Sequence, residues 1–491
     1  MERSSGILMH ISSLPNRFGI GSMGKEAYEF VDFLARAKQR YWQMLPLGPT
    51  GYGDSPYQLF SACAGNPYLI DIDLLLAQGL LTEDEAAPSC TPESDAVDYG
   101  RLYAQRFALL RLAFARGYKR DGAAFADFAQ ANKAWLNDYA LFMALKAHFG
   151  MVSFTLWPDA IRLREAAALA EYAELLKEDI RYYAYLQFLF FRQWSDLKAY
   201  ANKQGVRLIG DLPIYVSMDS ADVWAQPQVF QLNEARRPEW VSGVPPDYFT
   251  ADGQLWGNPL YDWEALKSTG YAWWCMRIRM NMRQFDMLRI DHFRGLDSYW
   301  RVKAQETTAR NGEWVDGPGM DFIRTIQAEF PGLPIIAEDL GYLTPSVREL
   351  VRASGFPGMK VLQFAFDPLE PSDYLPHNYM PNCVCYTGTH DNTTARGWFS
   401  EAACAEVHMA TRYLGLNCQE GYAWGMIRGG ISSAAALFVA QMQDYLDLPS
   451  AARMNTPGTT GGNWRWRMRP GAATPQLAEK LAYFTAMYSR G

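Results

Sequence analysis

Residues 287–295 read MLRIDHFRG, and this stretch decides how the chain is interpreted as a fold. Residues 287–290 form a short, largely apolar run that ends in Asp291 and His292, which is typical of a buried parallel strand followed by a polar loop. Arg289 and Asp291 are two positions apart, so in an extended strand both side chains lie on the same face. A guanidinium beside a carboxylate keeps that carboxylate ionised, as a nucleophile requires.

Similar apolar runs that end in polar or acidic residues recur along the chain. They lie at residues 6–11, 41–47, 206–209, 333–337, 361–366, 383–387 and 435–440. Helical patterns lie between several of them, such as those at 25–38 and 182–202. Strand and helix alternating about eight times predict an α/β fold, a (β/α)8 barrel with insertions.

The spacing of these runs is uneven, because about 160 residues separate the second run from the third. Residues 76–180 are rich in Ala, Leu and Glu, and they predict a helical subdomain with helices at 101–115, 124–149 and 160–177. Residues 215–275 are rich in Pro, Gly and Trp and are interpreted as a loop assembly over the barrel mouth. The catalytic barrel is then expected to comprise residues 1–75 and 181–491.

Composition and charge exclude several classes of protein. The 491 residues include 46 Lys and Arg against 53 Asp and Glu, a net charge of −7 without a basic block, so no nucleic acid partner is expected. Aromatic residues make up 14% of the chain and offer flat faces on which sugar rings stack. Seven scattered cysteines, no secretory signal and no long apolar stretch indicate a cytoplasmic protein without membrane contact.

Gly19, Gly21 and Gly24 form a GxGxxG pattern of the kind found in dinucleotide-binding folds. Here the pattern does not follow its strand directly, and the chain reads YWQMLPL at 41–47, where a dinucleotide fold expects an acidic residue. We therefore predict no dinucleotide site, and the sequence indicates neither another cofactor nor a metal.

Two further runs end in acidic residues, with Glu338 after residues 333–337 and Asp391 shortly after residues 383–387. A single acid at such a place is more often a capping carboxylate or part of a surface ion pair. The carboxyl ends of barrel strands converge on one mouth, however, so Asp291, Glu338 and Asp391 together predict an active site. Paired carboxylates without a reactive thiolate or a histidine cluster indicate glycoside chemistry.

The segments RIDHFRG (289–295), AEDLG (337–341) and GTHDN (388–392) resemble, in this order, barrel motifs of the α-amylase clan. Longer segments resemble the 4-α-glucanotransferases (amylomaltases) of glycoside hydrolase family 77, at 4–15, 54–72, 209–224, 243–263 and 453–467. Asp211 is followed by LPIYV and not by the Asn-His pair usual in α-amylases, which favours this family within the clan. Residues 441–448 depart from the family pattern, which often has Pro and Gly there.

The resemblance implies a retaining double displacement and a role for each acid. Asp291 is expected to form a glycosyl-enzyme, Glu338 to protonate the departing oxygen, and Asp391 to hold ring hydroxyls of a distorted sugar. Arg289 is expected to lower the pKa of Asp291, whereas burial and negative neighbours raise the pKa of Glu338. Further substrate contacts are expected from His292, His390, Tyr57, Asp211, Tyr248, Phe249, Trp256, Asn258 and Asn463. Both histidines could instead be packed at strand ends.

Transfer, as opposed to hydrolysis, requires that an acceptor sugar compete with water for the glycosyl-enzyme. Trp256, Tyr248 and Phe249 lie in the glycine-containing segment 243–263, a composition suited to a lid that stacks on the acceptor or to an ordinary packed loop. The expected function is transfer of α-1,4-glucan segments among maltooligosaccharides, amylose or other α-1,4-glucans, with glucose as an acceptor. An α-glucan hydrolase and an inactive glycan-binding barrel are the alternatives.

Overall fold

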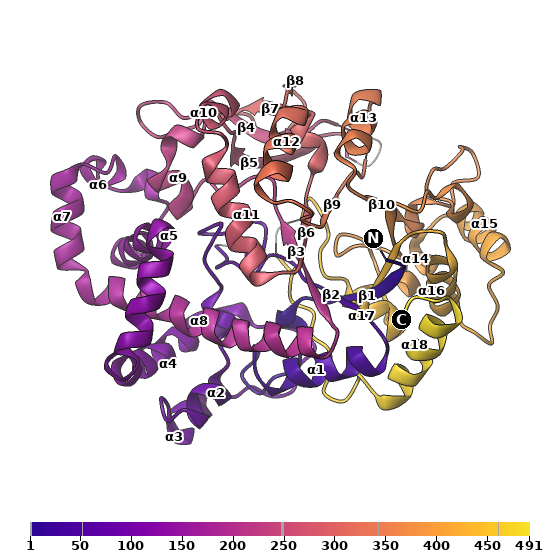
Figure 1. The fold of residues 1–491 in the computed structure, drawn as a ribbon, viewed down its shortest axis with the longest axis horizontal. Helices are drawn as coiled ribbons and strands as arrows, with labels where there is room; N and C mark the ends of the chain where they lie inside the picture. The colour runs from indigo at the N-terminus through magenta and orange to yellow at the C-terminus, as the bar shows by residue number, and fades with distance from the viewer. Residues whose placement is uncertain (1, 52, 247–249, 342, 460) are drawn as a thin grey trace.

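The structure of the protein, a computed structural model, describes residues 2–51, 53–246, 250–341, 343–459 and 461–491. Its centre is a ring of eight strands that pair in parallel in the order β10-β11-β12-β1-β2-β3-β6-β9 (Figure 1). The strands are β1 (Ser4–Leu8), β2 (Tyr41–Gln43), β3 (Arg207–Leu212), β6 (Met287–Ile290), β9 (Ile335–Ala337), β10 (Gly358–Val361), β11 (Cys383–Tyr386) and β12 (Leu437–Gln441). The backbone N–H of Ala337 donates to the carbonyl of Pro357, next to β10, and brings the two ends together. The predicted (β/α)8 barrel is confirmed.

One strand lies elsewhere than the apolar pattern predicted. The run at 361–366 was expected to be a strand, but β10 ends at Val361 and a 3-10 turn, Leu362–Phe364, follows it. Lys360 interrupts the apolar pattern inside the strand, and its Nζ lies 5.3 Å from the ring centre of Tyr374. The turn also contains a fully buried apolar residue, Leu362. In the sequence its apolar residues therefore resemble those of a buried strand.

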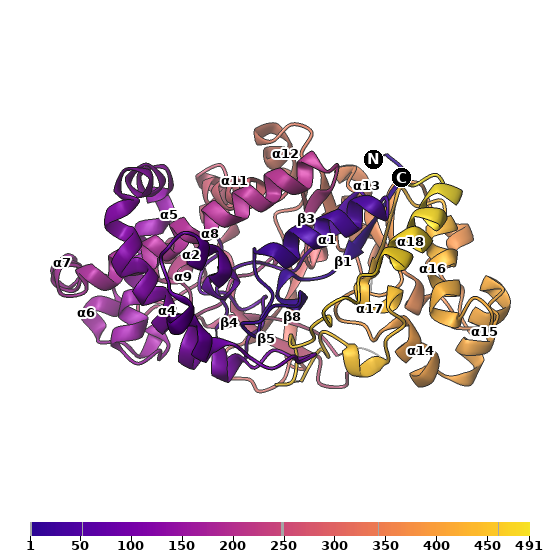
Figure 2. The same ribbon diagram turned by 90° about the horizontal axis from the view of Figure 1, so that it is seen from below.

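Helices surround the barrel and connect consecutive strands. Those of the outer ring are α1 (Lys25–Arg36), α8 (Lys177–Lys203), α11 (Ala272–Gln284), α12 (Gly319–Glu329), α13 (Pro345–Ser354), α14 (Ala395–Glu401), α15 (Cys404–Leu414), α16 (Tyr422–Ser432) and α18 (Pro475–Met487). The short helix α17 (Met442–Tyr445) directly follows β12 and is buried. The two ends of the chain lie side by side (Figures 1 and 2), where Arg3 Nε donates to the carbonyl of Tyr488 at 3.0 Å.

The helices between β2 and α8 gather on one side of the barrel (Figures 1 and 2). They are α2 (Ile72–Ala77), α3 (Glu83–Ala86), α4 (Tyr99–Arg120), α5 (Gly122–His148), α6 (Asp159–Arg162) and α7 (Ala166–Leu175). The helix expected at 160–177 is divided, because Arg164 has a left-handed φ of 62° that a continuous helix does not allow. We propose that residues 76–180 form a helical subdomain of the barrel.

The segment 215–275, expected to consist of loops, also contains regular structure. It includes α9 (Ala221–Ala225), α10 (Trp263–Ser268), β4 (Trp240–Val244) and β5 (Gln254–Pro259). These two strands join β7 (Ser298–Lys303) and β8 (Gly312–Asp316) in an antiparallel sheet of order β5-β4-β7-β8. The sequence does not show the alternation of apolar and polar residues that is typical of strands. The pairing of β4 with β5 is irregular between Val241 and Gly243, and β8 is mostly exposed.

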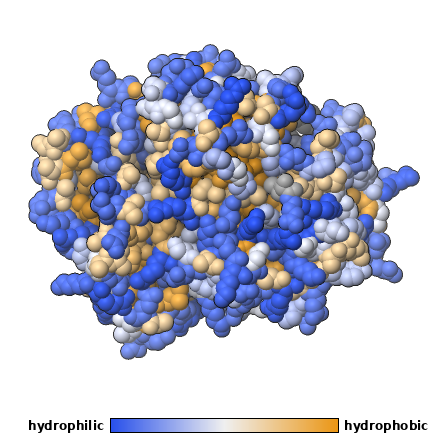
Figure 3. Space-filling model, viewed as in Figure 1, coloured by the Kyte–Doolittle hydropathy of each residue, from blue (hydrophilic) through white to orange (hydrophobic). Residues whose placement is uncertain are grey.

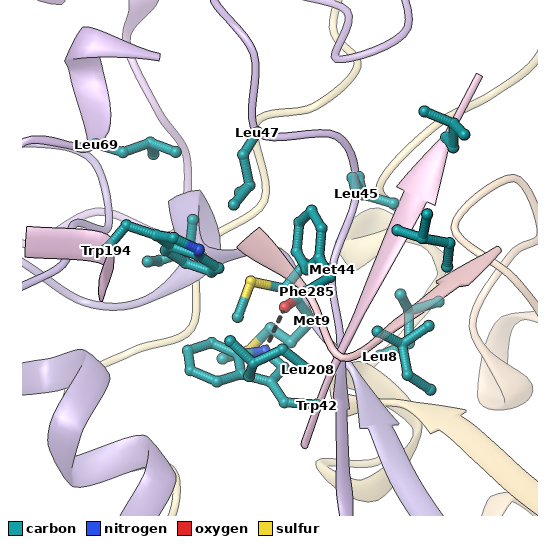
Figure 4. Close-up of a cluster of buried hydrophobic side chains, with 14 of the residues drawn as sticks. Leu8, Met9, Trp42, Met44, Leu45, Leu47, Leu69, Trp194, Leu208 and Phe285 are labelled. Carbon is teal, nitrogen blue, oxygen red and sulfur yellow. Dashed lines mark hydrogen bonds between the residues drawn. The ribbon is translucent and has the colours of Figure 1, made fainter. Parts of the chain in front are cut away.

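The barrel wall near β2 and β3 illustrates the packing of the core (Figure 4). Trp42 is fully buried, and its indole N–H donates to the carbonyl of Met9 at 2.7 Å, which satisfies the one polar atom of the side chain. Trp194 of α8 packs at 66° against the ring of Phe285, the C-cap residue of α11. The face of the molecule seen in Figure 3 is largely hydrophilic, with apolar patches between the hydrophilic areas. No helix in the described part of the chain is long and apolar enough to cross a membrane.

Candidate active site

The carboxyl ends of the barrel strands open into one large cavity of about 2670 Å³. Its lining includes ten of the residues expected from the sequence: Asp291, Glu338, Asp391, Arg289, His292, His390, Tyr57, Trp256, Asn258 and Asn463. Asp211 lies beneath this lining and is 1% exposed. Tyr248 and Phe249 lie outside the described residues. The structure therefore brings together side chains from strands far apart in the sequence.

Arg289 is held between two carboxylates at the floor of the cavity. Its Nη1 donates to both oxygens of Asp211 at 2.7 Å and to Oδ1 of Asp291 at 2.9 Å. Asp211 and Arg289 are directly opposite each other in the pairing of β3 with β6, which explains this contact. Tyr57 adds a hydrogen bond of 2.7 Å from its hydroxyl to Asp211. Asp211 thus fixes Arg289, and Arg289 orients Asp291.

The pKa of Asp291 differs from the expectation. Burial raises its pKa to about 6, and Arg289 acts in the opposite direction without outweighing the burial. The sequence shows that Arg289 lies two positions from Asp291. It does not show how deeply the carboxyl group of Asp291 is buried. Arg289 therefore lowers the pKa of Asp291 as expected, but burial outweighs it, so the net shift is upward.

Glu338, the acid that follows β9, also has a raised pKa. Burial raises its pKa to about 7, with a further increase from Asp291, while Arg289 and two backbone N–H groups act in the opposite direction. Those N–H groups belong to His292 and Leu340, and each lies 2.7 Å from a carboxyl oxygen of Glu338. Burial and the negative charge of Asp291 thus both favour the protonated form of Glu338.

Asp391 is the most accessible of these acids, with a side chain that is 44% exposed against 27% for Asp291. Asn455 Nδ2 donates to its Oδ1 at 2.6 Å, and Nε2 of His390 lies 3.4 Å from the same oxygen. Arg453 donates to its backbone carbonyl. Arg453 and Asn455 were not predicted individually, and only their place in the segment 453–467 pointed to them.

Aromatic rings form the walls beside these acids. Tyr57 stacks on His390 with ring centres 5.2 Å apart and planes at 16°. Trp256 approaches His292 edge-on, with ring centres 4.7 Å apart. Burial lowers the pKa of His292 to about 3, so this imidazole is neutral and offers a single N–H donor. Both histidines line the cavity, where a sugar can reach them.

The two asparagines among the expected contacts also bond within the protein. Asn258 is 5% exposed, and its Nδ2 donates to the carbonyl of Val216 at 2.9 Å. Asn463 accepts from the backbone N–H of Thr456 at 3.1 Å and stabilises the turn that follows.

Among the described residues, no group of three or more His, Cys, Asp or Glu could hold a metal ion.

The chain is similar to known proteins over nearly its whole length. A family profile described as 4-alpha-glucanotransferase matches residues 9–474. A 4-alpha-glucanotransferase from Clostridium butyricum is 48% identical over 98% of this chain and 100% of its own length. One from Thermus thermophilus is 47% identical over 98% of each chain. A solved structure, the amylomaltase from Streptococcus agalactiae in complex with acarbose, has a TM-score of 0.97 and 43% identity and covers 100% of both chains. The chain belongs to the 4-alpha-glucanotransferase family, glycoside hydrolase family 77.

Proposed function

We propose that this protein transfers α-1,4-glucan segments from a donor maltooligosaccharide to the 4-hydroxyl of an acceptor glucan or of glucose, by a retaining double displacement. Family membership supports the reaction. The observation that supports the mechanism is that Asp291 and Glu338 line one cavity, where burial and the charge of Asp291 raise the pKa of Glu338 to about 7. One acid can thus be ionised while its neighbour is still protonated.

In the first half-reaction Asp291 attacks the anomeric carbon of the donor. The bond from that carbon to the glycosidic oxygen breaks, its electron pair stays on the oxygen, and Glu338 gives its proton to that oxygen. Arg289 orients the attacking carboxylate by its 2.9 Å hydrogen bond. The products are a glycosyl ester on Asp291, a shortened glucan with a free 4-hydroxyl, and an ionised Glu338.

In the second half-reaction Glu338 takes the proton from the 4-hydroxyl of the acceptor. The acceptor oxygen attacks the anomeric carbon, and Asp291 leaves as a carboxylate. Two inversions restore the α-configuration, so the new linkage is again α-1,4. Because a water molecule at the same place would give hydrolysis, the outcome depends on how well the cavity binds the acceptor.

The remaining cavity residues bind the sugar and support the charge that develops on it. Asp391 is accessible enough to accept hydrogen bonds from ring hydroxyls, and Asn455 holds it in place. His292 and His390 donate hydrogen bonds to the reacting sugar, which strengthen as positive charge develops in the transition state. Tyr57 and Trp256 supply stacking faces beside these histidines.

The substrates proposed are maltooligosaccharides, amylose and other α-1,4-glucans, with glucose as an acceptor. The relative from Streptococcus agalactiae, which is described in complex with acarbose, supports binding of an oligosaccharide by this protein. We also propose a cytoplasmic location, which is supported by seven cysteines that are all free thiols.

Incubation of the pure protein with maltotriose alone tests the proposed reaction. Transfer predicts glucose together with maltopentaose and longer products, because every glucose released leaves a maltosyl-enzyme that can extend another maltotriose. A hydrolase would give glucose and maltose without longer products. A protein that only binds glycans would leave maltotriose unchanged, and either result would contradict the proposal.

A further inference from the structure

A buried carboxylate outside the cavity holds both ends of the segment that includes His390 and Asp391. Asp444 lies in α17, directly after β12, and is fully buried. Its Oδ2 accepts a hydrogen bond of 2.5 Å from the hydroxyl of Thr387, and its Oδ1 accepts one of 2.7 Å from the backbone N–H of Ala395. Thr387 is the residue before the segment 388–394, and Ala395 is the residue after it.

These contacts are not needed to begin the helix that follows. The N-terminus of α14 already has a cap, because the Thr394 hydroxyl oxygen accepts from the backbone N–H of Gly397 at 3.0 Å. The bond from Ala395 to Asp444 is therefore an additional one. Burying a carboxylate is costly even when it is hydrogen-bonded, and burial raises the pKa of Asp444 to about 6. A helix cap alone does not explain why such a group occupies this position.

The segment 388–394 is held from other sides as well. The carbonyl of Thr393 accepts from Gln363 Nε2 at 2.9 Å, and the Thr394 hydroxyl donates to the carbonyl of Leu448 at 2.7 Å. On the cavity side, Asn455 bonds the carboxylate of Asp391. Asp444 differs from these partners because one side chain contacts both ends of the segment and so sets the distance between them.

We propose that Asp444 is a positioning residue for Asp391 and His390, which it places by joining the two ends of the segment 388–394. This inference rests on the proposed function, in which both residues act on the sugar as the transition state forms. A small displacement of the segment should then weaken transition-state contacts more than ground-state binding. A misplacement of about 1 Å is enough to reduce a rate by about a hundredfold.

Three variants distinguish the positioning role of Asp444 from a general loss of structure. Asp444→Leu keeps a side chain that branches at Cγ but removes both acceptors, and we expect a kcat for maltotriose transfer about a hundredfold lower with little change in KM. Asp444→Asn can still accept from Ala395 and can donate to the Thr387 hydroxyl, so it should stay within about threefold of the wild type. Thr387→Val removes only the hydrogen bond from the Thr387 hydroxyl to Asp444, and a roughly fivefold loss of kcat is expected.

Asp71 provides a matched control elsewhere in the fold. It is also fully buried, and it accepts from the hydroxyl of Ser22 at 2.7 Å and from the backbone N–H of Leu74, at the start of α2, at 2.8 Å. It does not line the catalytic cavity in the described part of the chain. Asp71→Leu should therefore lower the unfolding temperature about as much as Asp444→Leu but leave the kcat of the folded enzyme unchanged.

All variants are assayed beside the wild type, at a temperature at which unfolding curves show each one to be folded. A selective fall in kcat for Asp444→Leu, with recovery in Asp444→Asn, supports the proposal. If Asp444→Leu does not fold, the same conclusion is drawn from a selective fall in kcat for Thr387→Val. Equal kcat losses in the Asp71 and Asp444 variants, or a Thr387→Val kcat like that of the wild type, would overturn it. A wild type that makes no transfer products would overturn the proposed function itself.

Discussion

The backbone N–H of His292 donates a hydrogen bond of 2.7 Å to Oε2 of Glu338. His292 directly follows Asp291, so the end of β6 is joined to the side chain that follows β9. The backbone of His292 has a left-handed φ of 49°, a conformation that non-glycine residues rarely adopt. Such strain is retained where the surrounding structure requires it. The relative position of Asp291 and Glu338, the proposed nucleophile and acid, is thus set partly by the main chain.

This connection leads to a geometric prediction. A retaining mechanism requires the carboxyl groups of Asp291 and Glu338 to lie about 5–5.5 Å apart, whereas an inverting one needs room for a water molecule between them. We expect the shorter separation, measured in a crystal structure of the protein with an inhibitor bound. A separation near 9 Å would exclude the covalent intermediate on Asp291.

As the pH increases, kcat/KM should first rise and then fall. Activity rises as Asp291 loses its proton, with a pKa of about 6, and falls as Glu338 loses its own, with a pKa of about 7. Because the two groups interact, the apparent values belong to the pair. We expect a narrow bell with its maximum between pH 6 and 7, measured with maltotriose at low concentration. A rate that stays constant up to pH 9 would contradict the acid role of Glu338.

Replacement of Glu338 by Gln tests that acid role chemically. Glu338→Gln removes the proton donor, so transfer from maltotriose should fall by at least about a hundredfold. α-Glucosyl fluoride has a leaving group that needs little protonation, so formation of the glycosyl-enzyme from it should be largely retained. Rates of fluoride release and of maltotriose transfer are compared for variant and wild type. Equal losses on both substrates would remove Glu338 from the acid role.

The same variant should alter how stability depends on pH. The pKa of Glu338 is raised from 4.5 to about 7 on folding, so the folded protein binds this proton more tightly than the unfolded chain. Stability from this group is therefore present below pH 4.5 and is lost as the pH rises through 7. Glu338→Gln removes the effect, so its stability relative to the wild type should increase by up to about 3 kcal/mol between pH 4.5 and 8. Urea unfolding at both pH values measures this difference, and a constant difference would contradict it.

The presence of Asp291, Glu338 and Asp391 in one cavity could be predicted from the sequence, because each directly follows a strand, or comes shortly after one, in a fold that gathers strand ends at one mouth. Arg289 and Asp291 share a face through their spacing alone. The bond from Arg289 to Asp211 could not be found in this way, because it depends on which residues of β3 and β6 pair. The raised pKa of Asp291 depends on burial, which only the assembled barrel produces.

Features formed by local irregularity were also missed. The antiparallel sheet β5-β4-β7-β8 joins residues from 240–259 with residues from 298–316, and an irregular pairing hides the alternation of its first strand pair. Asp444 lies in the segment 441–448, which the sequence marked only as a departure from the family pattern. Its contacts with Thr387 and Ala395 connect residues about 50 positions apart, a distance at which no local pattern gives a signal.

Trp256 gives a test of transfer itself, which depends on acceptor binding and not on the acids. Its ring lines the cavity and meets His292 edge-on, at the centre of the reaction. If it stacks on the acceptor, Trp256→Ala removes a contact that the acceptor sugar uses and water does not. Loss of such a face costs about 1–2 kcal/mol of acceptor affinity, roughly a tenfold change in partitioning. Formation of the glycosyl-enzyme should change less.

The measurement is the ratio of glucose released by hydrolysis to transfer products over a series of acceptor concentrations. We expect hydrolysis to gain share in Trp256→Ala at low acceptor concentration, and excess acceptor to restore part of the transfer. Trp240 provides a control on the same small sheet, because its ring lies against Arg301 and Lys303 and is not part of the described cavity lining. Trp240→Ala should keep the wild-type ratio. An unchanged ratio in Trp256→Ala at every concentration, with only a slower overall rate, would make Trp256 a packing residue and leave Tyr57 as the next candidate for acceptor stacking.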